Sequence, residues 1–286
     1  MEAYEVVRVF VNKAVVPGGS GRRGNPGYGS LKAVRLLVYS RQVGLGNDTR
    51  IVEHLKRHPE ALRGLGFRRA PDRTTVGRWW RRYANLLGRV FEWFSRLVRM
   101  VAPTKLLVVD STPLVDLYDM EAEWGFTGRG PFRGFKLHTA VNQLGLPLNA
   151  TVTSGNRYDS PLLPSLLEDL EAGYVLADAG YDSKANRKAA KSISAKPVIA
   201  VNPRRSVKRR RLKRKHKLLL KSKRYVVEQF NGLVKNQVLR GCWIKPQGIA
   251  KKASMVTAGL ISLNTTAIQA ILQGETSLKN VSQYWA

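Results

Sequence analysis

The stretch Leu106-Leu107-Val108-Val109-Asp110 decides the fold, because it places a buried strand directly before a carboxylate. Four consecutive apolar residues, two of them β-branched, are typical of a strand that is covered on both faces. A second stretch of this kind, Tyr174-Val175-Leu176-Ala177-Asp178, also ends on an aspartate. In an α/β sheet the carboxyl ends of neighbouring strands meet at the ligand crevice. If these two strands are neighbours, Asp110 and Asp178 face each other there.

The elements around these two strands predict an α/β fold. Two strands joined by a plausible hairpin turn follow the first, and a helix leads into the second. A helix, a further strand and two more helices complete the chain; the predicted ranges are 135–141, 147–153, 159–171, 183–194, 197–201, a helix holding residues 224–235, and 247–272. The order β-β-β-α-β-α-β-α is that of a ribonuclease-H-like mixed sheet with helices on its faces.

The chain before this sheet is expected to be an all-helical domain. Ser30 and Asp48 are candidate helix caps, Pro59 suits a first helical turn, and Thr74 or Thr75 opens a long helix to about Met100. Two short helices, a glycine-containing turn and a basic aromatic helix resemble a helix-turn-helix. The residues expected to contact DNA there are Arg78, Arg81 and Arg82. The alternative is an ordinary helical bundle with a solvated arginine face.

A late helix carries a third carboxylate. Arg224, Glu228 and Lys235 are four and seven residues apart, so they share one helical face. An apolar stripe on the same helix can seat it on the sheet; its members are Val227, Phe230 and Val234. Glu228 can then bind metal while Arg224 and Lys235 hold adjacent phosphates. Alternatively, these residues form only surface contacts worth tenths of a kcal/mol.

Three convergent carboxylates without histidine or cysteine support suit two Mg²⁺ or Mn²⁺ ions. Such ions activate an attacking oxygen and stabilise the leaving oxygen of a phosphodiester. The single cysteine, Cys242, excludes a disulfide scaffold and a multi-cysteine metal site. His54 and His58 have a possible zinc spacing, but no third ligand lies near them in the sequence.

The charge pattern indicates a polyanionic partner, most commonly nucleic acid. The chain of 286 residues carries a formal net charge of +29. Residues 1–101 and the run 204–224 are strongly basic, whereas residues 102–203 hold 10 basic and 11 acidic residues. The run 204–224 is expected to anchor DNA backbone, including through Arg209, Arg210, Arg211 and Lys221. No apolar stretch approaches the ~18 residues of a membrane helix, and the start lacks a signal-peptide pattern, so no membrane partner is expected.

For the remaining polar residues the sequence gives less specific predictions. Lys136 and His138 share one face of a strand and either line the DNA channel or are simply exposed. Asp159 and Asp182 are interpreted as helix caps. The acids after the first strand are expected on a mobile loop; they are Asp116, Asp119, Glu121 and Glu123.

Four motifs together resemble the insertion-sequence DDE transposases, nearest the families numbered four and five. They are Val108-Val109-Asp110-Ser111-Thr112, Gly134-Phe135-Lys136-Leu137-His138, Leu176-Ala177-Asp178-Ala179-Gly180-Tyr181-Asp182, and Arg224-Tyr225-Val226-Val227-Glu228 with Lys235. The last matches a Tyr-x2-Arg-x3-Glu-x6-Lys signature, with Lys221 in the tyrosine position. The resemblance spans roughly residues 104–270. It implies that Asp110, Asp178 and Glu228 bind the metal ions and that Arg224 and Lys235 contact transposon-end DNA.

The expected function is therefore metal-dependent cleavage at insertion-sequence ends followed by 3′-hydroxyl strand transfer into target DNA. The alternatives are a non-enzymatic DNA-binding relative, and a ribonuclease-H-fold nuclease or resolvase without strand transfer. The expected domains are residues 1–102, which bind DNA, residues 103–272, which are catalytic, and a tail, 273–286. The expected partner is double-stranded DNA, both terminal inverted repeats and target, bound by a homodimer. A cytoplasmic, nucleoid-associated location follows.

Overall fold

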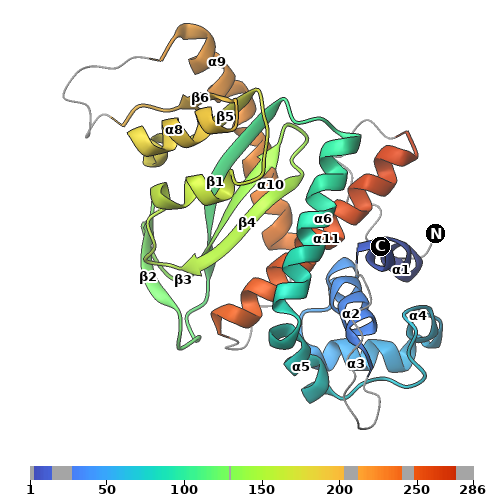
Figure 1. Cartoon of the computed structure of the whole chain (residues 1–286). Coiled ribbons are helices and arrows are strands. Elements are labelled where there is room, and N and C mark those ends of the chain that lie inside the picture. Colours follow the sequence, from blue (N-terminus) through green and yellow to red (C-terminus); the bar gives the residue numbers. More distant parts are fainter. Residues whose placement is uncertain (1–2, 15–27, 129, 203–211, 240–247, 275–286) are drawn as a thin grey trace. The chain divides into compact units, whose positions relative to one another are not determined.

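The computed structural model describes residues 3–14, 28–128, 130–202, 212–239 and 248–274 (Figure 1). The predictions for Arg209, Arg210, Arg211, Cys242 and the tail beyond 274 lie outside this part of the chain. The protein forms two compact units. One comprises residues 98–233, and the other comprises residues 1–97 together with 234–286.

The unit of residues 98–233 is built on a mixed six-stranded sheet. Its strands are β1 (Leu106–Val115), β2 (Glu123–Thr127), β3 (Gly130–Asn142), β4 (Pro147–Ser154), β5 (Tyr174–Ala177) and β6 (Lys196–Ile199). The order is β2-β3-β1-β5-β6, with β4 also paired to β3. β3 runs antiparallel to β1, whereas β5 is parallel to β1 and β6 is parallel to β5. The mixed α/β architecture predicted from the sequence is confirmed.

Two strands are longer than predicted, and β2 was not predicted. β1 continues beyond Asp110 to Val115, because its polar half pairs residue by residue with β3 as far as Val115 opposite Gly134. The hairpin between β3 and β4 is present as predicted. Its turn is closed by Asn142, whose Oδ1 accepts hydrogen bonds from the backbone N–H groups of Leu144 and Leu146.

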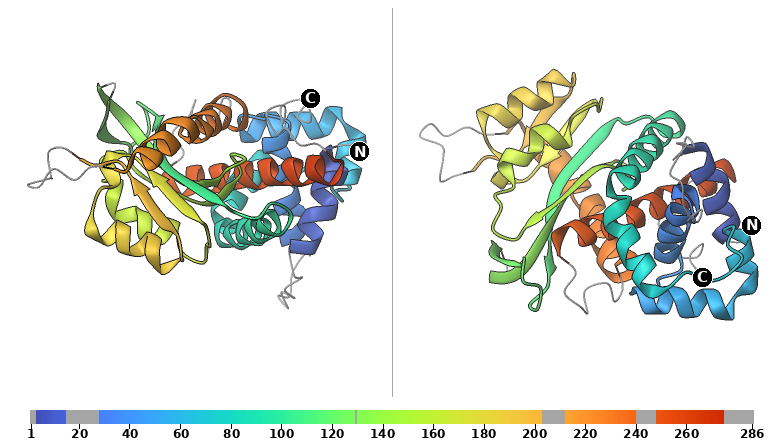
Figure 2. Two further views of the ribbon diagram at one scale, coloured as in Figure 1. Left: turned by 90° about the horizontal axis from the view of Figure 1, so that it is seen from above. Right: turned by 60° about the horizontal axis from the view of Figure 1, so that its bottom comes forward.

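The helices of this unit cover the two faces of the sheet, as Figure 2 shows. They are η1 (Ser160–Leu162), α7 (Leu163–Leu166), η2 (Ala179–Tyr181), α8 (Lys184–Ser192), α9 (Arg214–Lys223) and α10 (Tyr225–Leu233). The predicted helix 159–171 is wrong in length and is replaced by η1 and α7. Two prolines, Pro161 and Pro164, lack the N–H groups that a continuous helix needs, and Asp169 adopts a left-handed φ of 56°.

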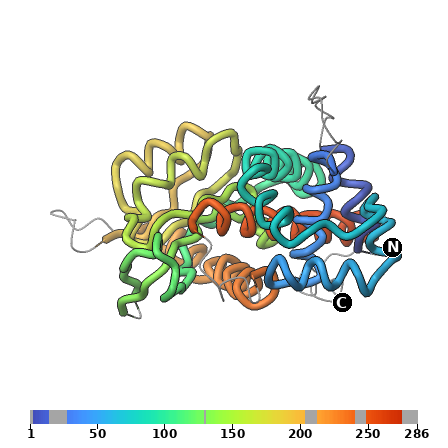
Figure 3. Tube along the Cα trace, turned by 90° about the horizontal axis from the view of Figure 1, so that it is seen from below, coloured from blue at the N-terminus to red at the C-terminus, as the bar shows by residue number. Residues whose placement is uncertain are grey.

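The other unit is helical throughout its described residues. Its elements are α1 (Ala3–Ala14), α2 (Ser30–Gln42), α3 (Asp48–Arg57), α4 (Pro59–Gly64), α5 (Arg73–Arg82), most of α6 (Ala84–Val101), the π-helical η3 (Val234–Val238) and α11 (Ile249–Leu272). The predicted long helix from Thr74 to Met100 is instead two helices, α5 and α6, which separate at Tyr83. Figure 3 shows α11, in red, among the N-terminal helices, and α11 packs against α1, α2 and α5.

Helix α11 alone among the described helices is long and apolar enough to span a membrane by composition. Its mean hydropathy reaches 1.5 over the most apolar window. However, 78% of that window is buried inside the protein. The helix is therefore the core around which this unit packs.

Asp48 ties α11 to two other helices. The sequence predicts it as a helix cap, but Asn47 caps α3 by accepting a hydrogen bond from the N–H of Arg50. The Asp48 carboxylate instead accepts a hydrogen bond from Trp80 Nε1 at 2.8 Å on α5 and pairs with Lys251 Nζ at 2.5 Å on α11. Both charged side chains are largely buried, so removal of either charge leaves the other without compensation.

We expect Asp48→Ala to lower the free energy of unfolding by about 3 kcal/mol, because it leaves the Lys251 ammonium buried and unpaired. Denaturant unfolding followed by circular dichroism measures this loss. The double variant Asp48→Ala with Lys251→Met should regain part of the stability. Equal stability of wild type and Asp48→Ala would show that this ion pair contributes nothing.

Candidate active site

Asp110 and Asp178 lie side by side at the point where the parallel pairing of β1 with β5 ends. Val109 is in register with Ala177, so each aspartate is the next residue along its chain. Asp110 continues in β1, whereas Asp178 turns the chain into η2, where its Oδ1 accepts a hydrogen bond from Gly180 N–H at 2.8 Å. The sequence predicted that the two aspartates face each other if their strands are neighbours, and β1 and β5 are neighbours.

The environment of Asp110 opposes its ionisation. Burial raises the pKa of its carboxyl from 3.8 to about 6, and the charges of Asp178 and Asp159 act in the same direction. The backbone N–H of Ser111 and the Arg224 guanidinium lower the pKa but do not cancel these effects. A buried carboxylate beside a second carboxylate favours either a proton or a cation between them.

Helix α10 packs on β1 and presents polar residues to Asp110. Its apolar residues Val227 and Phe230 are buried, as the stripe predicted. Asn231 Nδ2 lies 3.4 Å from Asp110 Oδ2, a long hydrogen bond. Arg224 and Asn231, which both act on Asp110, are seven residues apart and share a helical face with Glu228 between them.

Glu228 is on this face but is not drawn into the aspartate pair. Its side chain is 63% exposed and pairs with Arg224, with 3.5 Å between Oε1 and Nε. Within the described residues, no group of three or more acidic, histidine or cysteine side chains is close enough to hold a metal ion. The structure therefore brings Asp110 and Asp178 together and leaves Glu228 in a solvent-exposed ion pair on the adjacent helix.

A second polar cluster lies on the opposite face of β1. Asp159 accepts hydrogen bonds from Ser111 Oγ at 2.8 Å and from Lys136 Nζ at 3.1 Å, and it lies 3.8 Å from His138 Nδ1. Lys136 and His138 are 8% and 0% exposed, so the expectation of simple exposure is wrong. Burial lowers the pKa of His138 to about 4, although the nearby Asp159 charge acts against this.

Several other acids differ from their predicted roles. Ser183, not Asp182, caps α8 through the N–H of Asn186, and Asp182 pairs with Arg187 at 2.7 Å. Asp116 and Asp119 are 3% and 2% exposed. Asp116 accepts hydrogen bonds from the backbone N–H groups of Tyr118 and Asp119, and Asp119 accepts one from that of Glu121. Their prediction as mobile-loop residues is wrong, because these bonds fix the turn between β1 and β2.

The basic residues expected at DNA are distributed over several helices. Arg78, Arg81 and Arg82 are exposed on α5, and Lys221 is exposed on α9. Lys235 is half-buried in η3, directly after α10 in the chain. His54 accepts or donates a hydrogen bond at 2.9 Å to the Tyr39 hydroxyl, and its ring stacks on His58, which gives both histidines a structural role.

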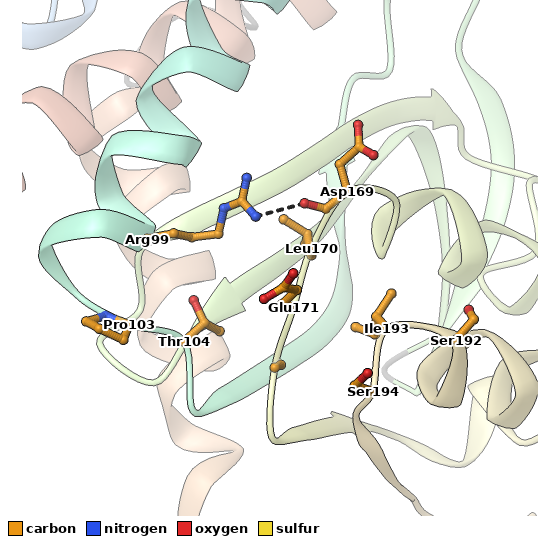
Figure 4. A pocket seen from close by; sticks show the side chains of 10 residues that line it. Arg99, Pro103, Thr104, Asp169, Leu170, Glu171, Ser192, Ile193 and Ser194 are labelled. Carbon is orange, nitrogen blue, oxygen red and sulfur yellow. Dashed lines mark hydrogen bonds between the residues drawn. The ribbon is translucent and has the colours of Figure 1, made fainter.

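A pocket of about 890 Å³ lies at the other end of the sheet (Figure 4). It is lined by Thr104, Ala172 and Ser194, which precede the parallel strands β1, β5 and β6. Arg99 in its wall donates a hydrogen bond to the Asp169 carbonyl oxygen at 2.8 Å. Ligands of open α/β sheets bind at the carboxyl ends of the strands, so the aspartate pair, not this pocket, is the candidate active site.

Residues 102–264 match the family model for the transposase DDE domain. This match covers more than half of the chain, and the protein belongs to that family.

Two curated relatives are transposases of insertion sequences. A Brucella ovis protein, assigned to element IS6501 as its transposase, is 44% identical over 73 residues, which are 25% of this chain and 56% of the relative. The transposase of element IS1106 from Neisseria meningitidis serogroup B is 34% identical over 116 residues, 40% of each chain. The chain thus spans about half the length of these relatives.

A solved structure, the piggyBac transposase synaptic complex with hairpin DNA, is similar at a TM-score of 0.47 and 11% identity. The similarity covers 99% of this chain and 76% of that chain.

The raised pKa of Asp110 predicts a pH-dependent stability difference in metal-free protein. The folded state holds this proton more tightly than the unfolded chain, so ionisation of Asp110 costs stability as the pH rises from about 4 to above 6. We expect Asp110→Asn to be more stable than wild type at pH 8 by about 1–3 kcal/mol, and the difference to disappear near pH 4. Thermal unfolding in EDTA across this range measures it.

The control is Glu228→Gln, the same acid-to-amide change at a side chain that is 63% exposed. If Asp110→Asn and wild type keep the same stability difference at pH 4 and pH 8, Asp110 does not titrate as the structure indicates.

Proposed function

We propose that this protein is an active insertion-sequence transposase that cleaves a phosphodiester at the element's end and joins the freed 3′-hydroxyl to target DNA. The observation that carries the proposal is the pair Asp110 and Asp178 on adjacent parallel strands, flanked by Arg224, directly before α10, and by Glu228 and Asn231 on α10. Membership of the transposase DDE domain family supports it.

We propose further that the sheet is a ribonuclease-H-like core. The order β4-β3-β1-β5-β6, with the first three strands antiparallel and β5 and β6 parallel to β1, supports this topology. In this proposal residues 103–272 are catalytic, and the helical residues 1–102 bind DNA in a helix-turn-helix-like manner.

The aspartate pair fits a divalent cation such as Mg²⁺ or Mn²⁺. All the donors are carboxylate oxygens, which hard cations prefer, and Asp110 lies in a partly buried place that raises the pKa of its carboxyl to about 6. Asp110 and Asp178 would hold the metal, and Glu228 would complete a second site once released from Arg224. When bound, a pair of such ions activates the attacking oxygen and neutralises the leaving oxygen.

The residues around this pair have separate proposed tasks. Asn231 orients the Asp110 carboxylate through its amide. Arg224, freed from Glu228, binds a phosphate beside the scissile bond, and Lys221 and Lys235 bind neighbouring phosphates. Arg78, Arg81 and Arg82 on α5 hold terminal-repeat DNA. Because two ends must be joined to one target, we propose that a homodimer assembles on the DNA.

Substitution of any proposed metal-binding residue should abolish DNA cleavage and strand transfer but leave DNA binding unchanged. We expect Asp110→Asn, Asp178→Asn and Glu228→Gln each to reduce end cleavage and strand transfer by at least about 100-fold. The matched control is Asp169→Asn at the opposite end of the sheet, where φ of 56° suits asparagine as well as aspartate. The assay contains the element's terminal repeats, a target plasmid and Mg²⁺, and a gel-shift monitors binding.

The products distinguish this proposal from its alternatives. Joined products support a transposase, cleavage without joining indicates a nuclease or resolvase, and shifted DNA without cleavage indicates a binding protein. Near-wild-type cleavage by Asp110→Asn in Mg²⁺ would contradict the metal-site assignment.

Phosphate contact by α9 predicts a specific change in salt dependence. Lys221 is exposed, so Lys221→Gln should leave the fold intact and reduce the slope of log affinity against log salt by about 1. Fluorescence anisotropy with labelled duplex over a range of salt concentrations measures the slope. The same slope in wild type and Lys221→Gln would show that this lysine does not contact phosphate.

A further inference from the structure

The ribbon formed by β2 and the adjoining part of β3 exposes two aromatic side chains that the proposed chemistry does not use. Trp124 is 60% exposed and Phe126 is 76% exposed. They are alternate residues of β2, so both project from one face of the strand. β2 is an edge strand of the sheet (Figure 1). The structure thus leaves a pair of large rings in solvent at this edge.

These rings lie on the same face of the sheet as Asp110. Asp110 is opposite Thr139 on β3, and Trp124 is opposite Arg133 on the same strand. Thr139 and Arg133 are six residues apart, an even number, so their side chains share a face. Six residues of strand span about 20 Å, which separates the aromatic pair from the proposed reaction centre along the sheet.

The ribbon is held rigidly although its rings are exposed. Gly125, between the two aromatic residues, packs so closely that a Cβ atom there would lie 2.1 Å from the Gly155 carbonyl oxygen. Arg133 donates hydrogen bonds to the carbonyl oxygens of Leu117 and Asp119 and so fixes the preceding turn. The backbone positions of Trp124 and Phe126 are therefore set by the fold, so that a ligand would have to order only their side chains.

The spacing and charge fit a nucleobase. Alternate residues of a strand are about 6.6 Å apart, roughly twice the 3.4 Å separation of stacked bases, which leaves room for one base between the two rings. Arg133 lies across from Trp124, whereas strand alternation places the Glu123 carboxylate on the other face. Flat aromatic surfaces beside a cation suit an unpaired base on its phosphate backbone.

We propose that Trp124 and Phe126 clamp one unpaired DNA base by stacking, on the Asp110 face of the sheet and about 20 Å from the reaction centre. This inference rests on the proposed function, because it assumes that DNA lies along this face. It adds a feature that cleavage does not require: recognition of a nucleotide that has left the duplex.

The experiment compares two duplexes of one sequence, with and without a single unpaired 2-aminopurine, binding to the full chain. Wild type should bind the bulged duplex more tightly and quench its fluorescence. In the double variant Trp124→Leu with Phe126→Leu, which keeps apolar bulk but removes both rings, affinity for the bulged duplex should fall about 5- to 100-fold. Affinity for the paired duplex should not change.

Two controls separate stacking from other effects. Trp124→Phe with Phe126→Tyr keeps both rings and should retain the preference. Leu144→Ala, at an exposed position near the opposite end of β3, should leave both affinities unchanged. Since all these side chains are exposed, thermal unfolding should match wild type throughout.

Three outcomes would overturn the inference. The leucine variant could retain the preference and the quenching, or wild type could show no preference for the bulged duplex. Alternatively, sedimentation could show that wild type alone is a dimer and the leucine variant a monomer, which would make the surface a contact between copies. Asp110→Asn should keep the preference, so a failure of cleavage and a failure of base stacking are distinguishable.

Discussion

The parallel pairing of β1 with β5 is the constraint on which the candidate site depends. It puts two carboxylates next to each other in a partly buried place, where burial and the charge of Asp178 raise the pKa of Asp110 to about 6. Such an arrangement lowers stability unless something offsets the repulsion. An arrangement that costs stability is typical of functional sites. Here a bound cation would offset the repulsion between the two carboxylates, which is the role proposed for the aspartate pair.

The rest of this unit supports that pair from both faces of the sheet. On one face, α10 packs its apolar residues on β1 and brings Asn231 to Asp110. On the other face, the Asp159 carboxylate accepts hydrogen bonds from the side chains of Ser111 and Lys136 and so fixes the β1 backbone next to Asp110. Glu228 lies apart from the aspartate pair, in an exposed ion pair with Arg224. In the proposed function this ion pair separates on binding, because Glu228 then binds metal and Arg224 binds a phosphate.

Sequence patterns predicted the apolar strand segments that lead into Asp110 and Asp178, because apolar runs followed by an acid are local signals, but they did not predict that β1 continues to Val115. They did not predict β2, whose polar and aromatic residues become a strand only through pairing with β3, or the break at Tyr83 between α5 and α6. The buried position of His138 likewise depends on partners distant in the chain, Thr153 and Asp159. Asp116 and Asp119 instead bind backbone N–H groups two or three residues further on, a local turn that was not recognised in the sequence. Asn231 could have been found, since it shares the helical face of Arg224 and Glu228.

The central claim is that Asp110 and Asp178 form one cation site, and calorimetric titration with Mn²⁺ at pH 8 tests it most directly. Wild type and Asp169→Asn should bind the metal alike, whereas Asp110→Asn and Asp178→Asn should each lose that binding. Undiminished binding of Mn²⁺ by either of these two variants would contradict the account.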